Sequence, residues 1–378
     1  MKVLLVNPWG INNDEYYTSG LIYALSKRID VDLAGNWHYK GNKPVGQFFP
    51  LFFKKSEFSK RKTRIIMRGI EYVAAYVRLL KIIKKNKYDY INIQWLLAYK
   101  IDKLFLKIIK KTKAKIVLTA HNAVPHVKGQ EYIADLNMIY GLVDIIIVHG
   151  EAIKKELLNN FPLYENKIIV QPHGAILQRK VLHESECINK SIKEKMDFKE
   201  SYIMFGNQFY NKGTDRLLKI WKSDYLKDDS KLLIIAGRRT DVFPELDEQL
   251  AGLKPDDNVL YMEGYIKDEL LDYLIIRSEA VLLPYRHASM SGVVFTAAEY
   301  SKTILTTNCG AICEYLENNE DSIVTENSDE GYRIGFHDLV SLSKQKRQEY
   351  GDCLYRNINK KYSWDKIAEM LVERVYVK

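Results

Sequence analysis

Residues 284–310 hold residue types whose order has a clear chemical use. The end of an apolar strand leads to a turn of small residues at Ser291 and Gly292, then to a short helix that carries Glu299. A turn that opens a helix presents unpaired backbone N–H groups and the positive end of the helix dipole, and both suit a diphosphate. A carboxylate one or two helical turns later can accept both hydroxyls of a ribose. The stretch indicates a nucleotide pocket; a buried turn with a capping serine is the alternative.

A second turn of this kind occupies residues 205–218. Gly206 ends an apolar run, and Lys212 with Gly213 opens a helix. A lysine at that place can hold one ammonium group beside a diphosphate, where it acts as a point charge. An ordinary capped helix is the alternative for this turn on its own.

The first half of the chain has two further candidates at strand ends. His121 closes the apolar run 115–121, and His126 follows it closely. Histidines there can hydrogen-bond sugar hydroxyls or a departing phosphate, and they titrate near neutral pH. A structural histidine is the alternative. The first connection, residues 7–20, is longer and richer in Gly, Asn and aromatic residues than a plain turn requires.

Together these motifs resemble the retaining family-4 glycosyltransferases of GT-B fold, in particular a bacterial polysaccharide-type subgroup with a His-Asn-x-x-Pro-His motif. Ser291 stands where the family usually has glutamate, and Asn207 stands where it has arginine. The resemblance extends over nearly the whole length. It rests on residues 93–95 (IQW), 121–126 (HNAVPH), 172–174 (PHG), 206–213, 284–286 and 291–314.

The resemblance implies roles for individual residues. Lys212 would stabilise the departing diphosphate, His121 would orient the donor sugar, and Glu299 would hold the ribose. Arg238, Arg239 or Arg286 would replace the missing arginine. The expected donor contacts are Gly10, Gly206, Asn207, Lys212, Arg238, Arg286, Ser291, Gly292, Val293, Val294, Phe295 and Glu299, and the expected acceptor contacts are Trp9, Tyr16, Tyr17 and His126.

The activity that the resemblance implies is transfer of a hexose-type sugar from a nucleoside-diphosphate sugar to a glycan or lipid-linked acceptor. Retention of configuration and a place in cell-surface polysaccharide synthesis belong to the same expectation. An epimerase acting on the donor alone, or a phosphorylase, is the alternative within this fold. No metal is expected, because the one Asp-x-Asp sequence, Asp30 to Asp32, is interpreted as a solvated strand end away from the other motifs.

Charge is distributed unevenly along the chain. Residues 1–180 hold 30 Lys and Arg against 14 Asp and Glu, whereas residues 181–378 hold 27 against 34. Residues 54–115 alone hold 19 basic and 4 acidic residues. Such a segment attracts anionic surfaces, either nucleic-acid phosphates or lipid headgroups. It lacks the aromatic interleaving of base-stacking surfaces, so an anionic membrane is the expected partner and nucleic-acid binding the alternative.

A helix over residues 63–85 is predicted inside this basic segment. Apolar residues recur there at steps of three and four, which is typical of an amphipathic helix. The basic residues lie largely off this stripe. The predicted apolar face is Ile66, Ile70, Val73, Val77, Leu80 and Ile83.

Length and composition predict a globular protein of two domains. Hydrophobic residues make up 47% of the 378, and no apolar run approaches the roughly 18 residues that span a bilayer. The N-terminus leads directly into an apolar strand without a signal-peptide pattern, so we expect a cytoplasmic protein on the inner face of the cell membrane. Its scattered cysteines, Cys187, Cys309, Cys313 and Cys353, predict free thiols.

Apolar runs alternate with helical patterns, which predicts parallel sheets covered by helices. The expected fold is two Rossmann-like domains facing across a cleft, residues 1–180 and 181–361, with a helix over 362–378 packing back on the first and a linker over 178–200. Strands are expected at 3–7, 90–96, 115–121, 144–150, 167–174, 201–206, 231–237, 258–264, 280–285, 303–308 and 322–325.

Overall fold

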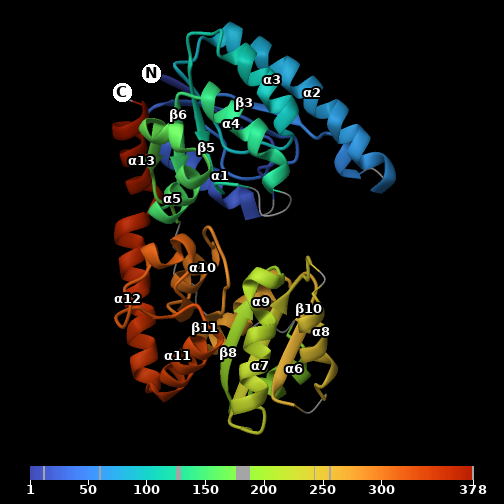
Figure 1. Ribbon diagram of the computed structural model, residues 1–378, viewed down its shortest axis with the longest axis vertical. Coiled ribbons are helices and arrows are strands. Elements are labelled where there is room, and N and C mark those ends of the chain that lie inside the picture. Colours follow the sequence, from blue (N-terminus) through green and yellow to red (C-terminus); the bar gives the residue numbers. More distant parts are fainter. Residues whose placement is uncertain are drawn as a thin grey trace. The chain divides into compact units, whose positions relative to one another are not determined.

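The computed structural model describes residues 1–11, 13–58, 61–124, 129–175, 188–241, 243–254 and 257–376. The chain forms two compact units (Figure 1): unit 1 contains Met1–Ile176 and Tyr362–Lys378, and unit 2 contains Leu177–Lys361. The expected boundary at residue 180 falls in 176–187, outside the described residues. Each unit has its own sheet and its own hydrophobic core.

Unit 1 is built on a parallel sheet whose described strands follow the order β3-β2-β1-β4-β5-β6-β7. The order reverses between β1 and β4, which makes the carboxyl ends of these two strands a topological switch point. The strands are β1 (Lys2–Asn7), β2 (Asp30–Asn36), β3 (Phe48–Phe52), β4 (Tyr90–Ile93), β5 (Lys115–Thr119), β6 (Ile145–Val148) and β7 (Ile168–Val170). The helices between them are α1 (Asn13–Leu25), α2 (Arg61–Asn86), α3 (Tyr99–Ile109), α4 (Ile133–Leu142) and α5 (Glu151–Asn160).

Unit 2 repeats this plan with the strand order β10-β9-β8-β11-β12-β13, again with parallel neighbours. Its switch point lies between β8 and β11. The strands are β8 (Glu200–Phe205), β9 (Lys231–Gly237), β10 (Val259–Glu263), β11 (Ser278–Leu283), β12 (Thr303–Thr307) and β13 (Ser322–Thr325). The described helices are α6 (Lys190–Met196), α7 (Thr214–Asp224), α8 (Pro244–Ala251), α9 (Asp268–Arg277), α10 (Val293–Glu299), α11 (Asp329–Ser341) and α12 (Lys344–Tyr362).

The predicted fold class of two Rossmann-like parallel-sheet domains is confirmed. All the apolar runs expected to be strands coincide with strands, because strands buried on both faces of a parallel sheet are nearly continuous in apolar residues. The strands expected from apolar runs do not include β3, and β2 was expected only through its start at Asp30. Both carry residues that weaken a strand pattern, Gly35 in β2 and Pro50 in the edge strand β3.

The sequence predicts that the start of β2 is solvated, but in the structure this strand end is partly buried. Asp30 is exposed, whereas Asp32 is fully buried. The Asp32 carboxylate accepts hydrogen bonds from the backbone N–H of Gln47 at 2.6 Å and the hydroxyl of Tyr88 at 2.6 Å, and it pairs with Lys2 at 3.3 Å. The prediction was wrong because the connection to β3 covers this end of β2.

The helix predicted over 63–85 is present as α2, but of its predicted apolar face only Ile83 is fully buried. Ile66, Ile70, Val73 and Val77 are 68, 66, 41 and 47% exposed. The buried residues are Tyr72, Ala75, Tyr76, Leu79 and Ile83. Periodicity alone allowed two apolar stripes on this helix, and the contact with α3 and β3 selects the one that carries the tyrosines.

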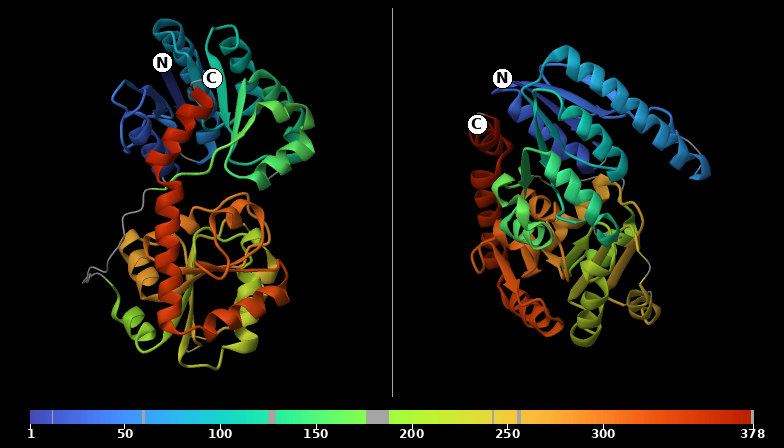
Figure 2. Two further views of the ribbon diagram at one scale, coloured as in Figure 1. Left: turned by 90° about the vertical axis from the view of Figure 1, so that its left-hand side faces the viewer. Right: turned by 45° about the horizontal axis from the view of Figure 1, so that its top comes forward.

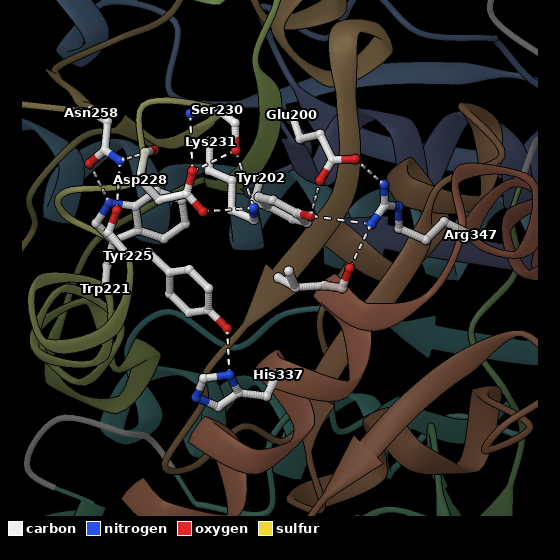
Figure 3. A network of polar contacts seen from close by, with 11 residues as sticks. Glu200, Tyr202, Trp221, Tyr225, Asp228, Ser230, Lys231, Asn258, His337 and Arg347 are labelled. Carbon is white, nitrogen blue, oxygen red and sulfur yellow. Dashed lines mark hydrogen bonds and ion pairs between the residues drawn. The ribbon is translucent and has the colours of Figure 1, made fainter.

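A network of polar contacts ties α12 to the central strand of unit 2 (Figure 3). The buried guanidinium of Arg347 donates to Glu200 Oε1 at 2.7 Å and to the hydroxyl of Tyr202 at 3.3 Å. Tyr202 in turn donates to Glu200 Oε2 at 3.1 Å. Because a buried charge is costly without a partner, this pairing fixes where α12 lies on β8.

The C-terminal segment belongs to unit 1. After α12, which runs along unit 2 in Figure 2, α13 (Trp364–Leu371) and a π-helical turn (Val372–Tyr376) pack against α1. The indole of Trp364 lies so close to Gly20 and Gly174 that a Cβ atom on either glycine would fall within 2.1 Å and 2.5 Å of it. Among the described residues, no helix has the length and apolar character needed to cross a membrane.

Candidate functional site

The two motifs of unit 2 meet at the switch point of its sheet. Residues 206–213 follow β8, residues 284–292 follow β11, and these strands are neighbours. A Cβ atom built on Gly206 would lie 4.0 Å from Cγ2 of Val293, the first residue of α10. Because ligands bind at the carboxyl ends of strands at such a point, the structure brings the predicted nucleotide residues to the expected place in this fold.

Two glycines allow the loops at this edge to approach each other closely. Gly213 has a φ of +70°, and a Cβ atom on it would lie 2.0 Å from the carbonyl oxygen of Pro284. Gly237 has a φ of +156°, and a Cβ atom on it would lie 1.9 Å from the carbonyl oxygen of Gly206. Any larger residue would force these backbones apart.

Lys212 is the cation that this arrangement leaves available. Its side chain is half-buried, and its Nζ lies 3.7 Å above the ring of Tyr285 and 5.7 Å from that of Phe209. Within the described residues no carboxylate pairs with it. The ring faces hold the ammonium group in place, while its N–H donors remain able to reach a phosphate.

The three arginines near this edge differ in whether a carboxylate pairs with them. Arg286 forms two hydrogen bonds of 2.7 Å with Asp215, and Arg239 pairs with Asp247 at 2.7 and 3.0 Å. Arg238 is exposed and has no ion pair among the described residues. Arg286 therefore braces the loop that carries Lys212, and Arg238 is the arginine whose charge is free for an anion.

The turn before α10 offers fewer donors than the sequence indicates. The N–H of Val294 donates to the carbonyl of Ser291 at 3.2 Å, and the N–H of Phe295 donates to that of Gly292 at 3.1 Å. In the described structure this leaves the N–H groups of Gly292 and Val293 without a partner. Gly292 is exposed, and a Cβ atom there would meet nothing within 4 Å.

The remaining predicted residues of unit 2 lie around this turn. Ser291 is buried, with its hydroxyl 3.2 Å from that of Tyr285, so it stabilises the turn from inside. Asn207 is exposed directly after Gly206. Glu299 is the last residue of α10 and is half-buried.

In unit 1, three histidines gather at the carboxyl edge of the sheet. His121, His149 and His173 follow β5, β6 and β7, which are neighbouring strands. The ring centroids of His121 and His149 are 4.9 Å apart, and those of His149 and His173 are 5.4 Å apart. His149 was not among the predicted site residues, although it follows an apolar run as His121 does.

Aromatic side chains from distant segments enclose this cluster. Trp95 stacks on His121 with 4.3 Å between the ring centroids and 6° between their planes. The ring of Tyr17 packs against His121, His173 and Trp364, with centroids 5.0, 4.7 and 5.0 Å away. The motif residues Trp95, His121 and His173 thus lie together with Tyr17 of α1.

The surroundings keep the histidines neutral. Burial lowers the pKa of His149 to about 4 and that of His173 to about 3, and it holds the pKa of His121 well below its usual value. The Nδ1 of His149 lies 3.0 Å from the carbonyl oxygen of Gln171, which can only accept, so neutral His149 carries its proton there. Its Nε2 then accepts a hydrogen bond from His121 Nδ1 at 3.2 Å.

The first connection of unit 1 is shorter than predicted. Helix α1 begins at Asn13, so Tyr16 and Tyr17 lie on a helix and not in a loop. Gly10 has a φ of +33°, and its N–H and that of Trp9 donate to the side-chain oxygen of Asn7 at 2.9 and 3.0 Å. A local Asx turn thus completes the connection, which the composition alone did not reveal.

The acceptor residues suggested by the sequence have different surroundings. Tyr16 is 73% exposed, Tyr17 packs among the histidines, and Trp9 lies with the guanidinium of Arg68 5.5 Å from its ring. His126 lies outside the described residues. Within the described chain no group of three or more His, Cys, Asp or Glu residues could hold a metal ion.

Comparison with known families agrees with this architecture. Residues 16–179 match the family described as Glycosyltransferase Family 4, and residues 200–333 match the family described as Glycosyl transferases group 1. The chain is therefore a glycosyltransferase with one domain of each kind, in the GT-B arrangement of two Rossmann-like domains.

Solved structures share the fold at low sequence identity. The chain is similar to HepE (Alr3699) of Anabaena in complex with UDP, with a TM-score of 0.71, 12% identity and full coverage of both chains. A glycosyltransferase of Rickettsia africae gives 0.67 and 16%, covering 98% of this chain and 97% of the other. The sucrose-phosphate synthase of Thermosynechococcus elongatus gives 0.71 and 13%, covering 100% and 98%. No curated protein matches the chain in sequence.

Proposed function

We propose that this glycosyltransferase moves a hexose-type sugar from a nucleoside-diphosphate sugar, bound at the carboxyl edge of the unit 2 sheet, to a glycan or lipid-linked acceptor with retention of configuration. The observation that carries this proposal is Lys212, a half-buried cation without a described carboxylate partner, held over Tyr285 at the switch point. The free N–H groups of Gly292 and Val293 lie on the neighbouring loop. Structures of HepE with UDP and with UDP-glucose support a uridine nucleotide as the donor.

In this mechanism the protein acts mainly by stabilising the leaving diphosphate. The bond between the anomeric carbon and the phosphate oxygen breaks, and its electron pair goes to that oxygen. Lys212, Arg238 and the free N–H groups before α10 offset the growing charge, which is usually the largest contribution to catalysis of such a step. The acceptor hydroxyl forms the new bond to the anomeric carbon and gives its proton to a phosphate oxygen.

We assign two further roles from the resemblance to family-4 enzymes. Glu299 would accept hydrogen bonds from the ribose hydroxyls, and His121 would orient the donor sugar. The neutral state of His121 suits this role, because a neutral imidazole binds hydroxyls without adding a charge near the reacting carbon.

Cell-surface polysaccharide synthesis is the process in which we place this activity. An anionic membrane, contacted through residues 54–115, would bring the enzyme to a lipid-linked acceptor on the inner face of the cell membrane. The basic residues of this segment support the proposal by their number, 19 against 4 acidic.

The test is donor binding by a matched pair of variants. A panel of UDP-, GDP- and other nucleoside-diphosphate sugars is screened for thermal stabilisation, and the best donor is titrated by calorimetry. We expect Lys212→Met and Glu299→Ala each to weaken binding and transfer at least about tenfold, because one charge-assisted hydrogen bond contributes roughly 1.5–3 kcal/mol. Lys219→Met, on the exposed side of α7, is the control.

Two results would contradict the proposal. Wild-type donor affinity in Lys212→Met would remove this lysine from the diphosphate site. Interconversion of the donor sugar without transfer to any acceptor would identify an epimerase instead.

A further inference from the structure

The surface of α2 carries an exposed apolar stripe, whose four side chains are 41 to 68% exposed. Ile66, Ile70, Val73 and Val77 follow one another at steps of four, three and four, so they lie along one side of the helix, and all are exposed. In Figure 1 and in the right view of Figure 2, α2 runs along the outside of unit 1 and its N-terminal part extends past the neighbouring helices. Such a contiguous apolar surface marks an interaction site.

Basic residues continue and flank this stripe. Lys81 and Lys84 extend it by further steps of four and three, and both are exposed. Helix α3 packs on α2, with the rings of Tyr76 and Phe105 stacked at 4.4 Å between their centroids. The exposed side of α3 also combines basic and aliphatic residues. It consists of Lys100, Leu104, Lys107 and Ile108.

The acidic residues of both helices are turned away from this surface. Glu71 accepts hydrogen bonds from the backbone N–H groups of Lys55 and Ser56 at 2.8 and 3.1 Å. Asp102 is buried, where it accepts from the hydroxyls of Tyr72 and Tyr76 at 2.6 and 2.9 Å. The exposed sides of α2 and α3 therefore combine aliphatic and cationic residues without a described carboxylate.

We infer that α2 and α3 form a membrane-insertion surface, in which the apolar stripe of α2 enters the interfacial layer of an anionic bilayer and the lysines contact the lipid phosphates. Apolar side chains bordered by cations are the composition of helices that lie in a bilayer interface. Nucleic acid fits less well, because four aliphatic side chains would face its phosphates and no exposed aromatic ring interrupts the stripe.

This inference deepens the membrane contact proposed above and replaces its purely electrostatic form. It also changes which basic residues are expected to contact the lipid phosphates. Arg68 is paired with Glu57 at 2.8 Å, and its guanidinium lies 5.5 Å from the ring of Trp9 and 5.7 Å from that of Phe53. Lys81 and Lys84 of α2 and Lys100 and Lys107 of α3 are exposed instead.

The experiment compares sedimentation of the full chain with vesicles of phosphatidylcholine alone and of phosphatidylcholine with about one third phosphatidylglycerol. Glutamine is the replacement throughout, because it keeps helix propensity while removing apolar surface or charge. The apolar variant is Ile66→Gln, Ile70→Gln, Val73→Gln and Val77→Gln. The cationic variant is Lys81→Gln, Lys84→Gln, Lys100→Gln and Lys107→Gln. The control variant changes four exposed lysines of unit 2: Lys219→Gln, Lys227→Gln, Lys346→Gln and Lys360→Gln.

The wild type should bind the anionic vesicles and keep part of this binding in high salt, because inserted side chains are not screened. The apolar variant should bind only at low salt, and the cationic variant should bind at least about tenfold more weakly at low salt. The control variant should behave as the wild type does. Thermal stabilisation by the donor nucleotide should be equal in all four proteins, which separates this inference from the sugar chemistry.

Three outcomes would overturn the inference. The first is wild-type protein that does not sediment with anionic vesicles. The second is an apolar variant whose binding resists salt as the wild type's does. The third is a wild-type dimer in sedimentation velocity that the apolar variant converts to a monomer without any effect of vesicles, since the stripe would then join two copies of the chain.

Discussion

At the scale of single residues, Lys212 of unit 2 and the histidine cluster of unit 1 have opposite electrostatic surroundings. Lys212 lies over aromatic faces that favour a cation, and no described carboxylate pairs with it. His121, His149 and His173 are held neutral, because burial disfavours the imidazolium form. The first setting suits a diphosphate and the second suits uncharged hydroxyls.

The neutral histidines predict a pH dependence of unit 1. Their pKa values are lowered in the folded state, so the unfolded chain takes up protons below about pH 6.5 that the folded chain does not, and stability falls as the pH is lowered toward 4. Each histidine contributes up to about 1.4 kcal/mol per pH unit in this range. His149→Gln should make the slope of unfolding free energy against pH shallower by about one such contribution, measured by urea unfolding between pH 4.5 and 6.

A slope that is the same in His149→Gln and the wild type would show that His149 is protonated in the folded protein. His337→Gln is the control on the surface of unit 2, where the imidazole lies 3.0 Å from Asp224.

At the scale of elements, strand-to-helix turns with closely approaching backbones shape the carboxyl edge of the unit 2 sheet. The loop after β8 is fixed to the loop after β11 by the Gly213 contact with Pro284 and by the pairing of Arg286 with Asp215. The loop before α10 instead leaves open space beside Gly292. Glycine thus permits a close backbone contact at Gly213 and leaves open space at Gly292.

This difference predicts opposite effects of alanine at two glycines. Gly213→Ala should destabilise unit 2 by at least about 2 kcal/mol, because it adds a left-handed backbone strain and a clash with Pro284. Gly292→Ala should leave stability unchanged or slightly higher, since its φ of −61° suits alanine. It should nevertheless weaken binding of the nucleoside diphosphate, because the methyl group would stand beside the free N–H groups.

Thermal unfolding and calorimetric titration of both variants check this pair of expectations. Unchanged nucleotide affinity in Gly292→Ala would place the diphosphate elsewhere on this edge.

At the scale of the whole molecule, the chain returns to its first unit after completing the second. Unit 1 is finished only by α13, whose Trp364 fills the space that Gly20 and Gly174 leave open. Tyr376, in the turn after α13, accepts a hydrogen bond from Asn92 of β4 at 2.6 Å. Val375 and Tyr376 are therefore part of the same core as Val3 and Leu5 of β1.

Truncating Trp364 should lower the stability of unit 1 and leave that of unit 2 unchanged. Trp364→Ala should destabilise unit 1 by about 3–5 kcal/mol, the usual cost of truncating a large buried aromatic residue. Differential scanning calorimetry should then show the transition of unit 1 at a lower temperature, whereas the nucleoside diphosphate should raise only that of unit 2. Equal shifts of both transitions in Trp364→Ala would show that the units unfold together.

The sequence by itself determined the fold class and the strands that are buried on both faces, because short apolar runs that alternate with helical patterns are typical of a parallel sheet covered by helices. It also located the two turns that meet at the unit 2 switch point, since glycine directly after an apolar run predicts a turn there. It did not reveal β3, whose Pro50 is tolerated only at the sheet edge. It did not single out His149, because a histidine after an apolar run has no meaning until its neighbours are known.

Only the tertiary structure decided which of several equivalent patterns was used. The periodicity of α2 allowed Ile66, Ile70, Val73 and Val77 to be its buried face, but the aromatic contacts of α3 and β3 bury Tyr72 and Tyr76 instead. In the same way, Arg238, Arg239 and Arg286 were equal candidates in the sequence, and only the structure shows that Arg286 pairs with Asp215 and Arg239 with Asp247. Burial and pairing depend on contacts between residues far apart in the chain, and local residue order does not specify these contacts.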